Sequence, residues 1–309
     1  MPRMSKTVRI AHLTDVHLGP IAGFTPRYWN LKRGVGYVNW LRKRRKVHSR
    51  EVLDRIVLDM WAQKPDHVVV TGDLVNIGLP QEHSNALHWL QSLGPPEHVT
   101  VIPGNHDIYT HIGSDPGTGR WGAYMAPNDD GRSYSVQGED FPFVRVVDGI
   151  ALVALNSSVP TPPLLAFGEI GASQLSRLEP ILTRLGDANV FRLVLIHHPP
   201  LVGQAGAARG LRDAEALQGV LTRGGAELVL HGHNHRDMFA WYPHRSGRAA
   251  IVGTPSASSA VAHRHEPAAR YNLLDIDPES KSIDLVGRGL RDADGMIVEL
   301  ERRKLVVAE

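Results

Sequence analysis

Short apolar runs of strand length alternate along this chain with longer segments of helical periodicity. The runs at 8–13, 67–70, 99–102, 150–155, 193–196 and 227–230 each end abruptly in polar residues. Helical patterns lie between them, one beginning after Ser49 and others covering about 81–93, 172–185 and 213–223. Because parallel strands need a crossover connection, this alternation predicts a layered α/β fold with parallel pairing.

The C-terminal portion has a different pattern. Strand candidates at 249–252, 271–276, 282–286 and 296–300 are joined by turns such as 277–280. This spacing predicts a second, antiparallel sheet. The chain shows no repeat period and no Gly/Ser-rich linker, so we expect residues 1–309 to form one domain with a two-sheet core.

Polar residues with ligand chemistry follow five of the strand candidates. In chain order they are Asp15 with His17, Asp73, Asn105 with His106 and Asp107, His197 with His198, and His233 with His235. Each group alone is more simply interpreted as a turn or a loop hydrogen bond. The carboxyl ends of strands in an α/β fold converge on one edge, however, so the five groups together predict a metal site. Since the chain contains no cysteine, its ligands would be oxygen atoms and imidazoles.

The order D-x-H, G-D, G-N-H-D, H-x-P and G-H-x-H between Asp15 and His235 resembles the signature of the calcineurin-like metallophosphoesterase family. The resemblance implies a four-layer α/β/β/α sandwich of two mixed sheets flanked by helices, with two divalent metal ions (Mn, Fe or Zn) at the sheet edge. It assigns Asp15, His17, Asp73 and His235 to the first ion, and Asp73, Asn105, His197 and His233 to the second. Asp73 would bridge the two ions. His197 is preferred to His198 because the ligand in this family lies two residues before a proline, here Pro199.

The resemblance also implies a mechanism, in which a hydroxide that bridges the two metal ions attacks phosphorus. It places His106 at the phosphoryl oxygen or the leaving group, with Asp107 orienting the His106 ring. A purely structural hydrogen bond is the alternative for His106. Four other histidines, His12, His111, His198 and His231, are not expected to bind metal.

A basic and aromatic segment follows the first ligand motif. No Asp or Glu occurs between Asp15 and Glu51, whereas nine Lys or Arg do, and five aromatic residues lie among them. The segment at about 20–48 looks like an insertion and leaves the sheet at the active-site edge, so it is a candidate wall or cap. Its residues could attract a phosphate-rich substrate, an anionic membrane surface or nucleic acid; a solvated basic face is the simpler alternative.

The function predicted on these grounds is metal-dependent hydrolysis of a small anionic phosphodiester, with 3′,5′-cyclic nucleotides as first candidates. The resemblance is to the bacterial branch that acts on cyclic nucleotides and glycerophosphodiesters. The alternatives are a phosphomonoesterase, a lipid-headgroup or pyrophosphate hydrolase at an anionic membrane surface, and a metal-free scaffold without activity. The lipid A pathway pyrophosphatases of this family carry arginine where this chain has His106, which argues against that assignment. Nucleic acid is the least expected partner, and the oligomeric state is not predicted.

The location follows from what the sequence lacks. The N-terminal residues MPRMSKTVRI contain no apolar signal region, and no apolar run approaches the roughly 20 residues of a spanning helix. We therefore expect a cytoplasmic protein, with contact to a membrane only at its surface, through residues 20–50.

Overall fold

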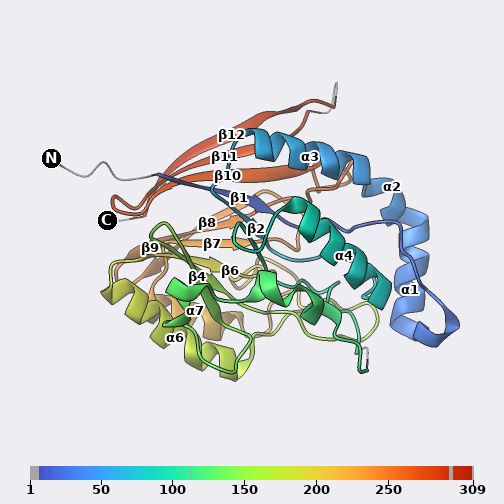
Figure 1. Ribbon diagram of the computed structural model, residues 1–309, viewed down its shortest axis with the longest axis horizontal. Helices are drawn as coiled ribbons and strands as arrows, with labels where there is room; N and C mark the ends of the chain where they lie inside the picture. The colour runs from blue at the N-terminus through green and yellow to red at the C-terminus, as the bar shows by residue number, and fades with distance from the viewer. Residues whose placement is uncertain (1–6, 112, 292–294, 308–309) are drawn as a thin grey trace.

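The computed structural model describes residues 7–111, 113–291 and 295–307. Two six-stranded mixed sheets pack face to face, and helices cover their outer faces (Figure 1). The first sheet has the strand order β12-β11-β10-β1-β2-β3 and the second has the order β4-β5-β6-β7-β9-β8. The predicted four-layer sandwich of two mixed sheets flanked by helices is confirmed.

The strands of the first sheet are β1 (Val8–Leu13), β2 (His67–Val70), β3 (Val99–Val101), β10 (Arg270–Asp277), β11 (Ser282–Leu290) and β12 (Ile297–Val306). Those of the second are β4 (Phe143–Val147), β5 (Ile150–Ala154), β6 (Phe191–Leu195), β7 (Leu228–His231), β8 (Met238–His244) and β9 (Gly247–Gly253). Helices α3 (Arg50–Ala62) and α4 (Pro80–Leu93) cover the first sheet, and α6 (Gly171–Asp187) and α7 (Ala214–Gly224) cover the second. None of the described helices has the length and apolarity that crossing a membrane requires.

The side chains of one strand alternate between two cores. In β2, Val69 packs in the core between the two sheets, whereas Val68 and Val70 pack against α3 and α4. The second sheet repeats this division, because Leu193 faces the first sheet and Val194 packs with α6 and α7. A strand buried on both faces is mostly apolar rather than alternating, which explains the apolar runs of the sequence.

The expectation of a separate antiparallel C-terminal sheet is wrong. Strand β10 pairs antiparallel with β1, so β10–β12 extend the first sheet, and β9 lies parallel to β7 in the second. The alternation of apolar residues specifies which face of a strand is buried, but it does not specify which neighbouring strand that strand pairs with. Two edge strands, β4 and β8, were not predicted at all; every residue of β8 is at least partly exposed, so its apolar pattern is weak.

The basic segment forms an arm beside the sheets. It contains a short 3₁₀ turn (Pro26–Tyr28), helix α1 (Leu31–Asn39), a π-helical turn (Trp40–Arg44) and helix α2 (Arg45–Val47). In Figure 1, α1 stands at one end of the molecule, away from both sheets. Two further short elements lie between β3 and β4, a 3₁₀ segment (Gly117–Met125) and α5 (Asp129–Arg132).

Candidate metal centre

The predicted ligands come together where the edges of the two sheets meet. On the first sheet, Asp15 and His17 follow β1, Asp73 follows β2 and Asn105 follows β3; on the second, His197 follows β6, and His233 and His235 follow β7. All seven side chains belong to buried residues. Each sheet therefore supplies part of one cluster.

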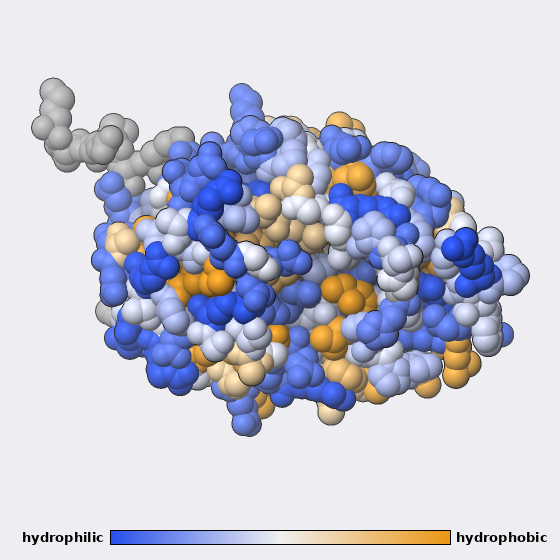
Figure 2. Space-filling model, turned by 60° about the horizontal axis from the view of Figure 1, so that its bottom comes forward, coloured by the Kyte–Doolittle hydropathy of each residue, from blue (hydrophilic) through white to orange (hydrophobic). Residues whose placement is uncertain are grey.

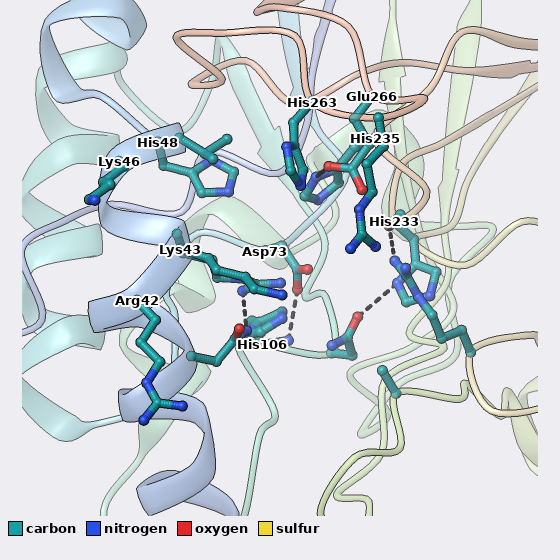
Figure 3. A pocket seen from close by; sticks show the side chains of 17 residues that line it. Arg42, Lys43, Lys46, His48, Asp73, His106, His233, His235, His263 and Glu266 are labelled. Carbon is teal, nitrogen blue, oxygen red and sulfur yellow. Dashed lines mark hydrogen bonds and ion pairs between the residues drawn. The ribbon is translucent and has the colours of Figure 1, made fainter.

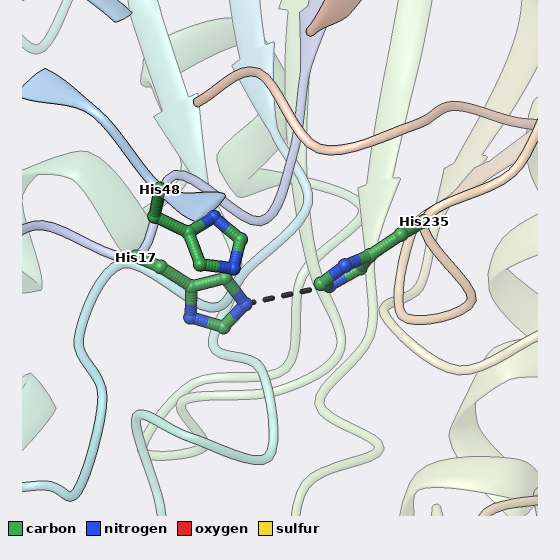
Figure 4. A group of neighbouring side chains, drawn as sticks. All are labelled: His17, His48 and His235. Carbon is green, nitrogen blue, oxygen red and sulfur yellow. Dashed lines mark hydrogen bonds between the residues drawn. The ribbon is translucent and has the colours of Figure 1, made fainter. Parts of the chain in front are cut away.

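The first group of ligand atoms surrounds His17. The Nε2 atom of His235 lies 3.1 Å from Asp15 Oδ1 and 3.4 Å from His17 Nε2. His17 Nε2 is 3.9 Å from both Asp15 Oδ1 and Asp73 Oδ2. Because His17 Nδ1 donates to the carbonyl of Val75 at 3.2 Å, the lone pair of His17 is on Nε2 and faces His235 (Figure 4).

The second group surrounds His197. Its Nε2 atom lies 3.4 Å from Asp73 Oδ2, 3.2 Å from Asn105 Oδ1 and 3.3 Å from His233 Nδ1. His197 Nδ1 donates to the carbonyl of Thr71 at 2.7 Å, which leaves the Nε2 lone pair for the cluster. The same carboxylate oxygen, Asp73 Oδ2, thus lies near both groups. This arrangement is the one that a bridging carboxylate would have.

The electrostatics of the cluster favour positive charge. Burial alone would raise the pKa of Asp73, but His197 and His106 hold it well below its ordinary value. Burial also opposes protonation of His197 and His235, yet the carboxylates of Asp73 and Asp15 respectively raise their pKa values to about 9. Divalent cations would replace these protons, and carboxylate, imidazole and amide ligands fit Mn, Fe or Zn.

The backbone is strained at most of the predicted ligands. Asp15, His17, Asp73, His233 and His235 all have positive φ, between 40° and 68°. Residues other than glycine seldom occupy this left-handed region, and those that do gather at functional sites. The chain therefore accepts an unfavourable backbone where its candidate ligands meet.

At two glycines of the motifs there is no room for a side chain. A Cβ atom on Gly232 would overlap the hydroxyl of Thr14 and the carboxylate of Asp15, and one on Gly104 would overlap Asp73. The G-H-N-H and G-N-H-D motifs bring their backbones this close to the opposite acids. Each glycine therefore permits the contact that its neighbouring ligand makes.

Asp107 does not orient the His106 ring as expected. Its Oδ1 accepts hydrogen bonds from the amides of Leu74 (2.8 Å) and Val75 (3.0 Å), and its Oδ2 from those of Asp73 and Gly104, both at 2.8 Å. Four buried amides thus use the acceptor sites of this carboxylate. Asp107 ties the loop after β2 to the loop after β3.

The contact that orients His106 comes instead from Asn76. His106 Nδ1 donates a short hydrogen bond to the carbonyl of Asn76. The Nη1 atom of Arg44 is 3.2 Å from the same nitrogen, and since both groups are then donors, the guanidinium acts on the ring by charge. Burial and Arg44 together lower the pKa of His106 to about 3.

A cavity of about 490 Å³ opens over the cluster. Figure 3 shows the basic arm on one side of it and His233 and His235 on the other, with Asp73 and His106 between them. Six cationic residues line this cavity: Arg42, Lys43, Arg44, Lys46, Arg209 and Arg264. A second cavity, of about 440 Å³, shares Arg44 and His106 and is lined further by Trp40 and Tyr109.

Sequence reasoning missed three residues at the centre. The ring of His48 is 4.5 Å from that of His17, Glu266 Oε2 is 3.2 Å from His235 Nδ1, and Arg209 donates to the carbonyl of His233 at 2.9 Å. These residues belong to loops or the arm and stand in no motif, so no pattern pointed to them.

Two of the four histidines that were not expected to bind metal, His12 and His198, have other partners. His12 bonds Thr71 and Thr254 through its two ring nitrogens. His198 bonds Ser157 and the carbonyl of Ala166.

Comparison with known proteins gives consistent results. The family model described as calcineurin-like phosphoesterase matches residues 8–237. A probable cyclic nucleotide phosphodiesterase of Pseudoalteromonas is 24% identical over 298 residues, which are 90% of this chain and 91% of that protein. A glycerophosphodiester phosphodiesterase of Enterobacter lignolyticus is 28% identical over 232 residues, 71% of each chain. The crystal structure of a dimetal phosphatase from Danio rerio shares the fold, with a TM-score of 0.66, 15% identity, and coverage of 97% of this chain and 99% of that one.

Proposed function

The chain belongs to the calcineurin-like phosphoesterase family and is a metal-dependent phosphoesterase, and we propose that it hydrolyses phosphodiesters, with 3′,5′-cyclic nucleotides as first candidates. The observation that carries the proposal is the pair of ligand groups that share Asp73 Oδ2 at the floor of a basic cavity. Relatives named for cyclic nucleotide and glycerophosphodiester hydrolysis support a diester over a monoester.

Two divalent ions are part of this proposal. The first would be held by Asp15, His17, Asp73 and His235, and the second by Asp73, Asn105, His197 and His233. When bound, such ions lower the pKa of water and withdraw charge from phosphoryl oxygens. The tautomers support the assignment, because backbone carbonyls take the Nδ1 protons of His17 and His197 and leave their Nε2 lone pairs for metal.

The chain itself supplies the remaining contacts with substrate. Arg44 and His106 line both cavities beside Asn105. A guanidinium stays charged even where burial lowers its pKa, so Arg44 would stabilise negative charge that develops on the phosphoryl group. His106, held by Asn76, would lie at the leaving group.

The first test compares two esters. Metal-stripped protein reloaded with Mn²⁺ should hydrolyse bis(4-nitrophenyl) phosphate faster than 4-nitrophenyl phosphate, and Asn105→Ala should lose this activity. Faster hydrolysis of the monoester would favour the phosphomonoesterase alternative. Stoichiometric metal without hydrolysis of either ester would refute the diesterase proposal, and absence of metal binding would support the scaffold.

The role of His106 has its own test, based on leaving groups. If His106 assists departure of the leaving group, His106→Ala should lose more activity with a poor leaving group, the alkoxide of a 3′,5′-cyclic nucleotide, than with the 4-nitrophenoxide of bis(4-nitrophenyl) phosphate. Arg44→Gln should reduce both reactions by a similar factor, because it acts on the phosphoryl oxygens. Equal losses for His106→Ala across leaving groups would remove His106 from this role.

A further inference from the structure

Helix α1 exposes its apolar face and buries two of its cations, the reverse of the usual arrangement. Leu31, Val35 and Val38 are 63%, 39% and 43% exposed, whereas Lys32 and Arg33 are only 7% and 3% exposed. The three apolar residues have the spacing i, i+4 and i+7, which places them on one face of the helix. A helix at the surface of a soluble protein normally turns such a face toward the core.

The orientation of the helix is fixed by its buried cations. Lys32 Nζ donates to the carbonyl of Tyr109 at 2.9 Å and to Thr161 Oγ1 at 2.6 Å. Arg33 donates to the carbonyls of Ile77 and Gly78, at 3.2 Å and 2.7 Å. Rotating α1 to hide its apolar face would break these bonds and leave buried carbonyls without partners, at a cost of about 1–3 kcal/mol per group. The apolar face is therefore held outward.

Further apolar side chains extend this face. Trp29, just before the helix, is 63% exposed. Leu164, which is 85% exposed, lines the second cavity together with Val35. In Figure 2, hydrophobic residues lie near the centre and at the end that carries α1, between hydrophilic ones. The exposed row therefore extends to the wall of the second cavity.

The surroundings of this apolar row are strongly basic. No acidic residue occurs between Asp15 and Glu51, and the arm that carries the row exposes five cations, of which three also line the first cavity: Arg27, Arg42, Lys43, Arg45 and Lys46. Two copies of such a face would repel each other, so charge argues against self-association through α1. An anionic partner is favoured.

We propose that helix α1 and Trp29 dock the protein on an anionic lipid surface. The apolar row has about five side chains, whereas a stable protein interface needs roughly 20–30 residues a side. A bilayer accepts a short apolar row in its interfacial region when basic residues next to it contact anionic headgroups, and tryptophan favours that region. Docking in this orientation would place the second cavity, which Val35 and Leu164 line, next to the lipid surface. The proposal stands independently of the hydrolytic activity.

The test is co-sedimentation of the full chain with vesicles of phosphatidylglycerol and phosphatidylcholine, compared with phosphatidylcholine alone. Only the anionic vesicles should bind the protein. Arg27→Gln with Arg45→Gln, two cations that line neither cavity, should weaken partitioning about 25-fold, since each basic residue near the surface contributes about fivefold. Leu31→Ser with Val38→Ser should weaken it at least tenfold.

The controls remove comparable apolar or cationic side chains elsewhere on the surface. Partitioning should be unchanged in two control variants, Leu58→Ser on α3 and Lys64→Gln with Lys304→Gln. Leu58 is 72% exposed. Circular dichroism should show that all variants fold. Absence of binding to anionic vesicles, or equal binding of the α1 variants and the controls, would overturn the proposal. A dimer that depends on Leu31 and Val38, detected by sedimentation velocity, would assign the face to a second copy instead.

Discussion

Replacement of Asp107 by asparagine should destabilise the fold rather than act on catalysis alone. The carboxylate accepts four buried amide protons, from Asp73, Leu74, Val75 and Gly104. The single oxygen of asparagine can serve two of them, and its NH₂ group would face the other two. Each buried N–H that loses its acceptor costs about 2 kcal/mol, so Asp107→Asn should lower the free energy of unfolding by about 4 kcal/mol.

The assay is urea unfolding of metal-free protein in EDTA, because weaker metal binding would otherwise add to the measured loss. Asp129→Asn is the matched control: its side chain is 96% exposed, and the change should stay within about 0.5 kcal/mol. If Asp107 acted mainly on the His106 ring, Asp107→Asn would lower kcat and leave the free energy of unfolding unchanged. That result would refute the structural role argued from the four amides.

Three further outcomes are expected. Burial lowers the pKa of His67 to about 3, so protonation favours the unfolded chain below about pH 6.5. Between pH 7 and pH 5, the free energy of unfolding should therefore fall by about 2 kcal/mol more in the wild type than in His67→Gln. Urea unfolding at the two pH values would measure this difference. Glu227→Gln should cost about 3–5 kcal/mol by the same method, because it leaves a buried cation of the Arg192–Glu227 pair without its partner. Joint replacement of Arg42, Lys43 and Lys46 by glutamine should lower kcat/KM for anionic diesters and weaken the dependence of kcat/KM on ionic strength. Steady-state kinetics at several salt concentrations would measure both effects. An unchanged salt dependence would contradict a role of these cations in attracting the substrate.

The sequence predicts the central strands well and the sheet edges poorly. Strands β1 and β2 were predicted at their observed bounds, because strands buried on both faces leave unmistakable apolar runs. Strand β8 is an edge strand that contains Pro243, and its residues alternate weakly, so nothing in its pattern separates it from a loop. The partner of β10 was also beyond prediction, since pairing with β1 depends on contacts that local alternation does not encode.

The same limit explains which parts of the site were missed. Residues at strand ends, such as Asp15 and His233, are marked by their place after an apolar run. Glu266 and His48 reach the cluster from a loop and from the arm, and only the tertiary fold brings them there. The function of Asp107 was misread for a related reason: its neighbour in sequence is His106, but three of its four amide partners lie more than 30 residues earlier.

The backbone strain at the candidate metal cluster and the exposed apolar face of helix α1 have the same physical explanation. Asp15 and Asp73 are buried, and they and three of the histidines have left-handed backbones, so local propensity opposes the native conformation at each of these positions. Helix α1 likewise buries Lys32 and exposes Leu31 against its own pattern. Conflicts of this kind lower stability unless a ligand or surface offsets them, and they persist where function requires them. In this chain the conflicts lie in two adjacent places, the candidate metal cluster and the arm beside it, which is the arrangement expected if cations offset the first and an anionic surface offsets the second.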